Sequence, residues 1–278
     1  MNKSTQSLFD INPKQIAEAR ALVHLACQPL SRAARANRVA ESDDSHSSFG
    51  WHAGHNALVT LPLDPARRFQ LGFGFSVVSV LWLEDDRIVD RMHVADLDAV
   101  SLDGWVDQRL AEVGLVSICE ASMPYALDAT PDFATLADMD REVRILGDWF
   151  GVAHEVLTEI IQAFGELAIQ PLSIRCWPHH FDLAVLIQLD EGDAEAVRSV
   201  GVGLSPGDEH YNQPYFYCSP WPVSESIALP ELPPPLRWHT QGFTSAIALA
   251  VDLHSGDDFG ELLVRSVDSV LHTLGAGR

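Results

Sequence analysis

The residue types best suited to chemistry gather in the second half of the chain, beginning with the run from Trp177 to Asp182. On a strand, His180 and Asp182 would point to one face and His179 to the other. Because an imidazole changes its charge near neutral pH, a histidine beside a carboxylate suits general acid–base work. If the protein is an enzyme, the pattern predicts the following catalytic residues: His180, Asp182 and Glu209.

Imidazole and carboxylate groups are also the ligands of divalent transition metals. In a metal-dependent hydrolase the ion would activate water and a spare carboxylate would move the proton. The candidate ligands for such an ion are His180, Asp182, Glu209 and His239, with His210 as a further one. However, no H-E-x-x-H or H-x-H spacing places two ligands on one element. The sequence therefore favours structural or ligand-lining roles over metal ligation, and neither a metal nor a cofactor is predicted.

Aromatic side chains accompany these polar groups. Tryptophan and tyrosine commonly line ligand pockets because they combine a broad apolar face with a polar tip. The predicted ligand-binding residues are Trp177, His179, His210, Tyr215, Tyr217, Trp221, Trp238 and His239. The leading hypothesis is a pocket that binds a small molecule, with the metal-dependent hydrolase as the alternative. An ordinary hydrophobic core built from the same rings is equally compatible with the sequence.

The run Gly203-Leu204-Ser205-Pro206-Gly207 matches the G-x-S-x-G pattern of serine hydrolases. In those enzymes the oxyanion hole uses the backbone N–H of the residue after the serine, and proline has no N–H. The segment that follows leads into an aromatic strand, whereas a nucleophile elbow needs a helix there. We therefore interpret this run as a turn and reject an esterase.

Composition limits the partners and the compartment. The 278 residues carry a formal net charge of -21, which disfavours binding to nucleic acid. An interaction protein that uses its basic residues 1–38 for contact is a third hypothesis.

The four cysteines form no C-x-x-C pair, which is typical of reduced thiols. No apolar run approaches the ~20 residues that span a bilayer. The sequence thus predicts a cytoplasmic protein without membrane contact, and it leaves the oligomeric state open.

The elements that would position these residues follow from periodicity. Asn12 and Pro13 predict a helix start, with Pro29 near the helix end. Apolar residues alternate with polar or small ones over 69–76, as in a half-buried strand. A turn at 84–86 and a helix that starts at Asp96 or Asp98 follow.

The C-terminal part repeats this mixture of elements. Residues 180–187 alternate as a strand, 230–235 form a stiff proline-rich loop, and two helices are predicted over 243–253 and 258–274. Because strands cluster and do not alternate strictly with helices, we predict an α+β fold of largely antiparallel sheets packed against helices. We expect an N-terminal helix and loop (1–48) and two α+β halves (49–125 and 126–278), the second with the candidate site. Two further hypotheses are that the halves are similar to each other and that all of these parts form one compact domain.

Several segments in this order resemble a bacterial family known only as a domain of unknown function. The segments are 51–52, 69–73, 112–115, the Phe-Asp-Leu-Ala-Val run at 181–185, Gly-x-Ser-Pro-Gly at 203–207 and Pro-Tyr-Phe-Tyr at 214–217. The resemblance covers residues 50–275 and consists of the order of these segments and their general residue types, without a specific motif match. It implies a cytosolic bacterial protein and supplies no catalytic residues. His179 and His180 stand where the family has small residues, so the resemblance implies that they are not a shared catalytic feature.

Overall fold

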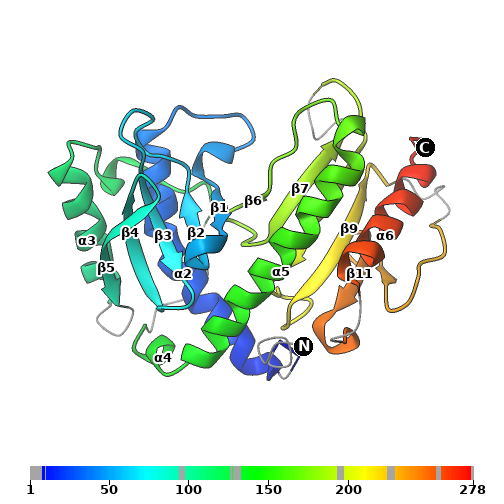
Figure 1. The fold of residues 1–278 in the computed structure, drawn as a ribbon, viewed down its shortest axis with the longest axis horizontal. Helices are drawn as coiled ribbons and strands as arrows, with labels where there is room; N and C mark the ends of the chain where they lie inside the picture. Colours follow the sequence, from blue (N-terminus) through cyan, green and yellow to red (C-terminus); the bar gives the residue numbers. More distant parts are fainter. Residues whose placement is uncertain are drawn as a thin grey trace. The chain divides into compact units, whose positions relative to one another are not determined.

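The computed structural model describes residues 8–9, 11–93, 98–125, 127, 133–192, 197–223, 229–254 and 258–276. The chain forms two compact units. The N-terminal unit consists of residues 12–151 and 175–181, and the C-terminal unit of residues 1–11, 152–174 and 182–278. Both units pair antiparallel strands and pack helices against them, which confirms the predicted α+β class (Figure 1).

The N-terminal unit contains helix α2 (Pro13–Asn37), strands β1 (Phe49–His52), β2 (Ala57–Thr60), β3 (Phe69–Gly74), β4 (Ser79–Glu84) and β5 (Arg87–His93), and helix α3 (Ala99–Glu112). The short helix α4 (Phe133–Ala137), the first half of α5 (Asp140–Phe164) and the short strand β6 (Arg175–Cys176) complete it. Its strand order is β6-β1-β2-β3-β4-β5, and every described pair is antiparallel. Helix α2 packs on β2 and β3.

Local sequence signals explain several boundaries in this unit. The Asn12 side chain accepts a hydrogen bond from the backbone N–H of Lys14, which confirms the predicted start of α2. Asp98 caps α3 in a capping box with Ser101, whereas Asp96 lies outside the described residues. Helix α2 continues to Asn37, so the predicted end near Pro29 was wrong. Leu30 and Ala33, which follow Pro29, are buried. The free energy of this packing outweighs the loss of the backbone hydrogen bond that Pro29 cannot donate.

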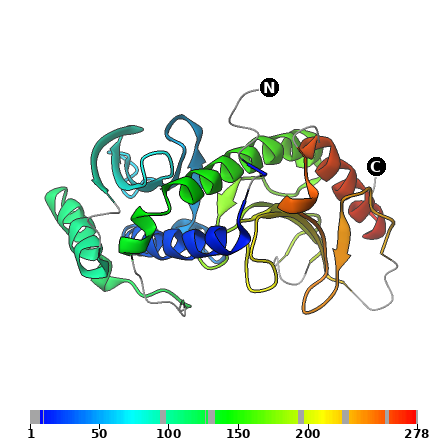
Figure 2. The same ribbon diagram turned by 90° about the horizontal axis from the view of Figure 1, so that it is seen from below.

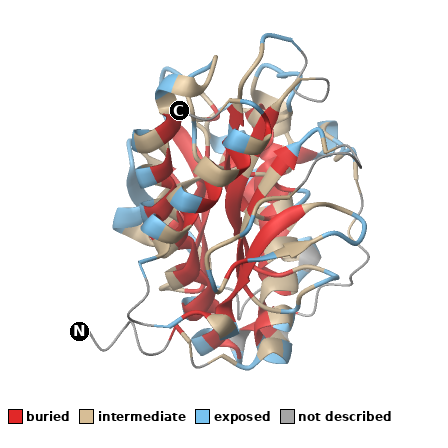
Figure 3. Ribbon diagram, turned by 90° about the vertical axis from the view of Figure 1, so that its right-hand side faces the viewer, coloured by how far each residue is buried: buried red, intermediate tan, exposed pale blue. Residues whose placement is uncertain are grey.

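The C-terminal unit contains the second half of α5, strands β7 (Leu183–Gln188), β8 (Ser199–Ser205), β9 (Tyr215–Trp221), β10 (Arg237–His239) and β11 (Ser245–Leu249), and helix α6 (Phe259–Thr273). The strand order is β10-β11-β9-β8-β7. Figure 2 shows α6 against one face of these strands, and α6 contacts β8 and β9. In Figure 3 the strands are largely buried, whereas α6 is buried along one side and exposed along the other.

The helix predicted over 258–274 is confirmed as α6, but the helix predicted over 243–253 was wrong. Residues 245–249 form strand β11, and a single 3-10 turn follows at Ala250–Asp252. All five residues of β11 are buried between neighbouring strands. A short, continuous apolar run has no periodicity that separates a buried strand from a buried helix, so only the pairing with β9 and β10 identifies it.

Each half of the chain has a long helix, a series of antiparallel strands and a closing helix, in that order. The predicted similarity of the two halves beyond this order, and the predicted boundaries near residues 48 and 125, stay predictions. None of the helices in the described part of the chain combines the length and apolar character that crossing a bilayer requires.

Candidate functional site

The predicted site residues fall in both units. Trp177, His179 and His180 belong to the N-terminal unit, whereas the chain enters the C-terminal unit at Asp182. The other predicted residues all lie in the C-terminal unit: Glu209, His210, Tyr215, Tyr217, Trp221, Trp238 and His239. We therefore describe the two groups separately.

In the N-terminal unit the predicted histidines lie beside a buried one, His24 of α2. The His24 ring stacks on Phe181 at 4.6 Å and 12°, and its Nε2 lies 2.7 Å from the carbonyl oxygen of Pro178. Because a carbonyl only accepts, Nε2 carries the proton. Burial lowers the pKa of His24 to about 4, and the positive charges of Arg20, His179 and His180 act in the same direction.

The segment around these histidines is held in place by several contacts. Phe181 has a φ of 59°, a left-handed conformation that is costly for a large side chain, and only 1% of the residue is exposed. The His179 and His180 rings lie 4.2 Å apart, and both residues are partly covered by the protein and partly exposed to solvent. Burial and then His180 lower the pKa of His179 to about 4. The Trp177 indole N–H donates to the carbonyl of Asp43 at 3.4 Å. The hydrogen bond to Asp43 fits a structural role for Trp177. Among the described residues of this unit, no carboxylate lies in hydrogen-bond contact with His180 to make a catalytic pair.

The sheet of the C-terminal unit has two distinct faces. Strand registers place Val202, Cys218 and Ala246 on one face, where the Phe216 ring lies 5.8 Å from Phe259 of α6. The opposite face, which we call the tyrosine face, carries Tyr215, Tyr217 and His239, together with Tyr211, Asp182 and Asp208. Trp238 belongs to the helix-covered face, and its indole N–H donates to the carbonyl of Pro230 at 2.8 Å.

Three hydrogen-bonded pairs form the tyrosine face. The Tyr217 hydroxyl donates to Asp182, and the Tyr215 hydroxyl donates to Asp208 at 2.5 Å. His239 Nε2 lies 2.7 Å from the carbonyl of Gln241, which can only accept, so Nε2 donates there and Nδ1 is the acceptor for the Tyr211 hydroxyl at 2.8 Å. All three tyrosine hydroxyls therefore donate to other side chains of this face. Tyr215 is buried, whereas Tyr211 and Tyr217 pack beside it and keep part of their surface exposed.

A glycine makes one of these pairs feasible. A Cβ atom on Gly203 would lie 2.8 Å from the Tyr217 hydroxyl and 2.6 Å from the carbonyl of Leu183. The absent side chain lets the Tyr217 ring cross strand β8 and reach Asp182 before β7. Burial, and then the hydrogen bond and charge of Asp208, raise the pKa of Tyr215, so this phenol remains a donor across the physiological range.

The remaining predicted residues lie at the margin of this face. His210 packs against the rings of His239 and Phe243, each at 5.3 Å. The Glu209 side chain is 89% exposed and lies 3.7 Å from His210, which does not suit a buried proton-transfer group. Trp221 is 50% exposed at the end of β9. Sequence reasoning missed Asp208, although its turn context, with backbone N–H groups of His210 and Tyr211 donating to its side chain, is a recognisable Asx-turn signal.

Within the described ranges, no group of three or more His, Cys, Asp or Glu residues is arranged to hold a metal ion. The tyrosine face thus brings together Asp182, His210, Tyr215, Tyr217 and His239 as a hydrogen-bonded, aromatic surface and not as a ligand sphere. No family model, no curated protein and no solved structure matches the chain. The arguments for function therefore rest on the residues themselves.

Proposed function

We propose that the protein binds a small organic molecule rich in hydrogen-bond donors, such as a protonated amine, on the tyrosine face. The observation that supports this proposal is the direction of the three hydroxyl hydrogen bonds. Because all three hydroxyls donate to side chains of the protein, the partly exposed Tyr211 and Tyr217 offer their oxygens to a ligand as acceptors, near the carboxylates of Asp182 and Asp208. A carboxylate ligand would find no donor among these three phenols.

The face also has open surface for a ligand. Leu186 is 41% exposed, and a Cβ atom on Gly201 would meet nothing within 4 Å. Leu186 pairs with Gly201, and Gly201 pairs with Ser219. Ser219 lies two residues after Tyr217 on β9, so all of these residues lie on the same face of the sheet. The exposed Leu186 provides apolar surface on the same face as the tyrosine rings, and ring faces attract cations. These features support a compact amine with an aliphatic body.

The metal-dependent hydrolase is not carried further, because its proposed ligands are not grouped within the described residues. We retain the cytoplasm as the proposed location, since Cys27, Cys119 and Cys218 form no disulfide among the described residues and reduced thiols are usual there. The net charge of -21 supports the view that nucleic acid is not a partner.

The first prediction compares two ligands of equal length and opposite charge. Cadaverine, with an ammonium group at each end, is expected to bind the full chain, whereas glutarate, with a carboxylate at each end, is expected not to bind. Trp221 lies on the same side of β9 as Tyr217 and provides the fluorescence signal. A Trp221→Phe variant should lose the signal but keep the binding enthalpy measured by calorimetry.

Asp182→Asn is expected to weaken cadaverine binding roughly fivefold to thirtyfold, because it removes a charge worth about 1–2 kcal/mol at this range. Asp190→Asn is the matched control. It changes the net charge equally, but Asp190 lies beyond the other end of β7, where it pairs with Arg198 at 2.8 Å. Equal binding of glutarate, or equal weakening by both variants, would contradict the proposal.

A further inference from the structure

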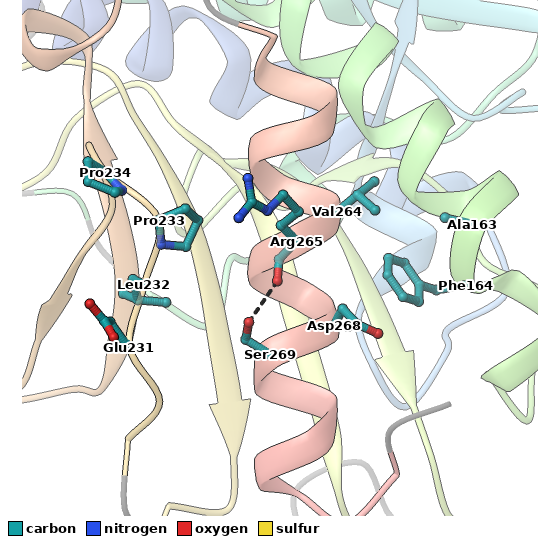
Figure 4. A pocket seen from close by; sticks show the side chains of 10 residues that line it. All are labelled: Ala163, Phe164, Glu231, Leu232, Pro233, Pro234, Val264, Arg265, Asp268 and Ser269. Atoms are coloured by element: carbon teal, nitrogen blue, oxygen red, sulfur yellow. Dashed lines mark hydrogen bonds between the residues drawn. The ribbon is translucent and has the colours of Figure 1, made fainter.

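A pocket of about 710 Å³ lies on the C-terminal unit, away from the residues of the tyrosine face. It is formed by the end of α5, the outer side of α6 and the proline-rich loop that precedes β10 (Figure 4). The lining residues are Ala163, Phe164, Glu231, Leu232, Pro233, Pro234, Val264, Arg265, Asp268 and Ser269. Its volume lies within the roughly 300–1,000 Å³ that is usual for small-molecule pockets.

The walls of the pocket are apolar and partly rigid. Phe164 of α5 and Val264 of α6 form one side, and Leu232, Pro233 and Pro234 of the loop form the other. Proline fixes one backbone dihedral, so such a wall loses little conformational freedom when a ligand binds. Leu232, Pro233 and Val264 are only partly buried, which leaves apolar surface available to a ligand side chain.

Two oppositely charged residues of α6 point to different sides of the pocket, and Glu231 lies on the loop side. In Figure 4 the Arg265 guanidinium points toward Pro233, whereas Asp268 points toward Phe164. The two residues are three apart on a helix, where an ion pair is within reach, but none forms. Asp268 instead lies 3.7 Å from His272. No hydrogen bond or ion pair joins the Arg265 guanidinium to another described residue, although arginines elsewhere, such as Arg32 and Arg198, pair with carboxylates.

We propose that this pocket binds a short peptide with free ends and an apolar side chain. The planar guanidinium of Arg265 matches the geometry of a terminal carboxylate, which it can bind with two parallel hydrogen bonds. Asp268, on the other side of α6, supplies negative charge for the terminal ammonium group. The apolar side chain packs against Phe164, Val264 and the loop prolines. A free amino acid has the same chemistry, but the pocket volume exceeds what a single residue fills.

The test uses calorimetry on the full chain with the tripeptide Ala-Ala-Leu, its N-acetyl form, its C-terminal amide and free leucine. The free-ended tripeptide is expected to bind best, and each blocked form about tenfold more weakly, the loss of one charged contact. Leucine should bind more weakly than the tripeptide. Leucine binding as tight as tripeptide binding would overturn the assignment of a peptide.

Variants assign the two ends. In Arg265→Gln the free acid and the amide should bind equally, and in Asp268→Asn the free and the acetylated amino ends should bind equally. Arg87→Gln, a change at an exposed arginine of β5 in the other unit, is the control and should leave all four affinities unchanged. Persistence of the carboxylate preference in Arg265→Gln, or no binding of any peptide, would overturn the proposal. Because no lining residue belongs to the tyrosine face, these results do not depend on amine binding there.

Discussion

Gly147→Ala is expected to destabilise the protein by about 3 kcal/mol, even though alanine is the better helix former. Gly147 lies inside α5, and a Cβ atom there would come within 2.7 Å of Asn56 Oδ1 and 2.8 Å of Phe75 Cγ. The Phe75 ring cannot withdraw, because it is fully buried and packs against Trp51 at 5.8 Å and Phe150 at 5.4 Å. Chemical denaturation at neutral pH measures the change in unfolding free energy.

Gly104→Ala provides the matched control for this prediction. Gly104 lies inside α3, and a Cβ atom at this position would meet nothing within 4 Å. The same substitution should therefore stabilise the protein by up to about 1 kcal/mol through helix propensity alone. If both variants change the unfolding free energy in the same direction, the prediction that Phe75 leaves no room for a side chain at Gly147 is contradicted.

The second large effect is a loss of stability in acid that depends on His24. In the folded protein His24 has a pKa of about 4, against an ordinary value of 6.5, because the ring is buried. As the pH falls below 6.5, the unfolded chain takes up a proton at this histidine while the folded protein does not. The stability that the neutral ring contributes is thus complete above pH 6.5 and is lost as the pH approaches 4.

His24→Gln separates this contribution from other acid effects. Glutamine keeps an N–H donor for the Pro178 carbonyl but carries no proton-binding ring, so the variant lacks this linkage. Between pH 7 and pH 4.5, the wild type is expected to lose roughly 2 kcal/mol more unfolding free energy than the variant. Denaturant titrations at a series of pH values test this expectation. Parallel profiles for the two proteins would show that His24 is not held neutral by its surroundings.

The predicted site illustrates where residue types suffice and where they do not. The tyrosines and histidines of the C-terminal unit were identifiable as a polar, aromatic group from their types and density alone. Their organisation depends on strand register, since Tyr217 stands opposite Gly203 and only this pairing brings its hydroxyl to Asp182. The run from Trp177 to Asp182 is continuous in the sequence. In the structure its residues up to Phe181 belong to the N-terminal unit, and Asp182 belongs to the C-terminal unit.

The pocket beside α6 shows the same limit more strongly. Phe164, Pro233 and Arg265 are far apart in the chain, and none carries a motif that marks it for binding. Arg265 reads as an ordinary exposed helix residue. Its guanidinium has no pairing group among the described residues and stands beside the apolar wall of the pocket, and this placement is a property of the surrounding elements and not of the residue.

Local sequence patterns predicted the α+β class, the capped start of α2, a helix start at either Asp96 or Asp98, and the closing helix α6. These features depend on neighbouring residues, because capping, turn formation and helical periodicity act over a few positions. Tertiary structure alone decided that α2 continues past Pro29, that residues 245–249 form a strand, and which side chains meet at each site. Those outcomes depend on burial and strand pairing between distant segments, whose free energies exceed local preferences.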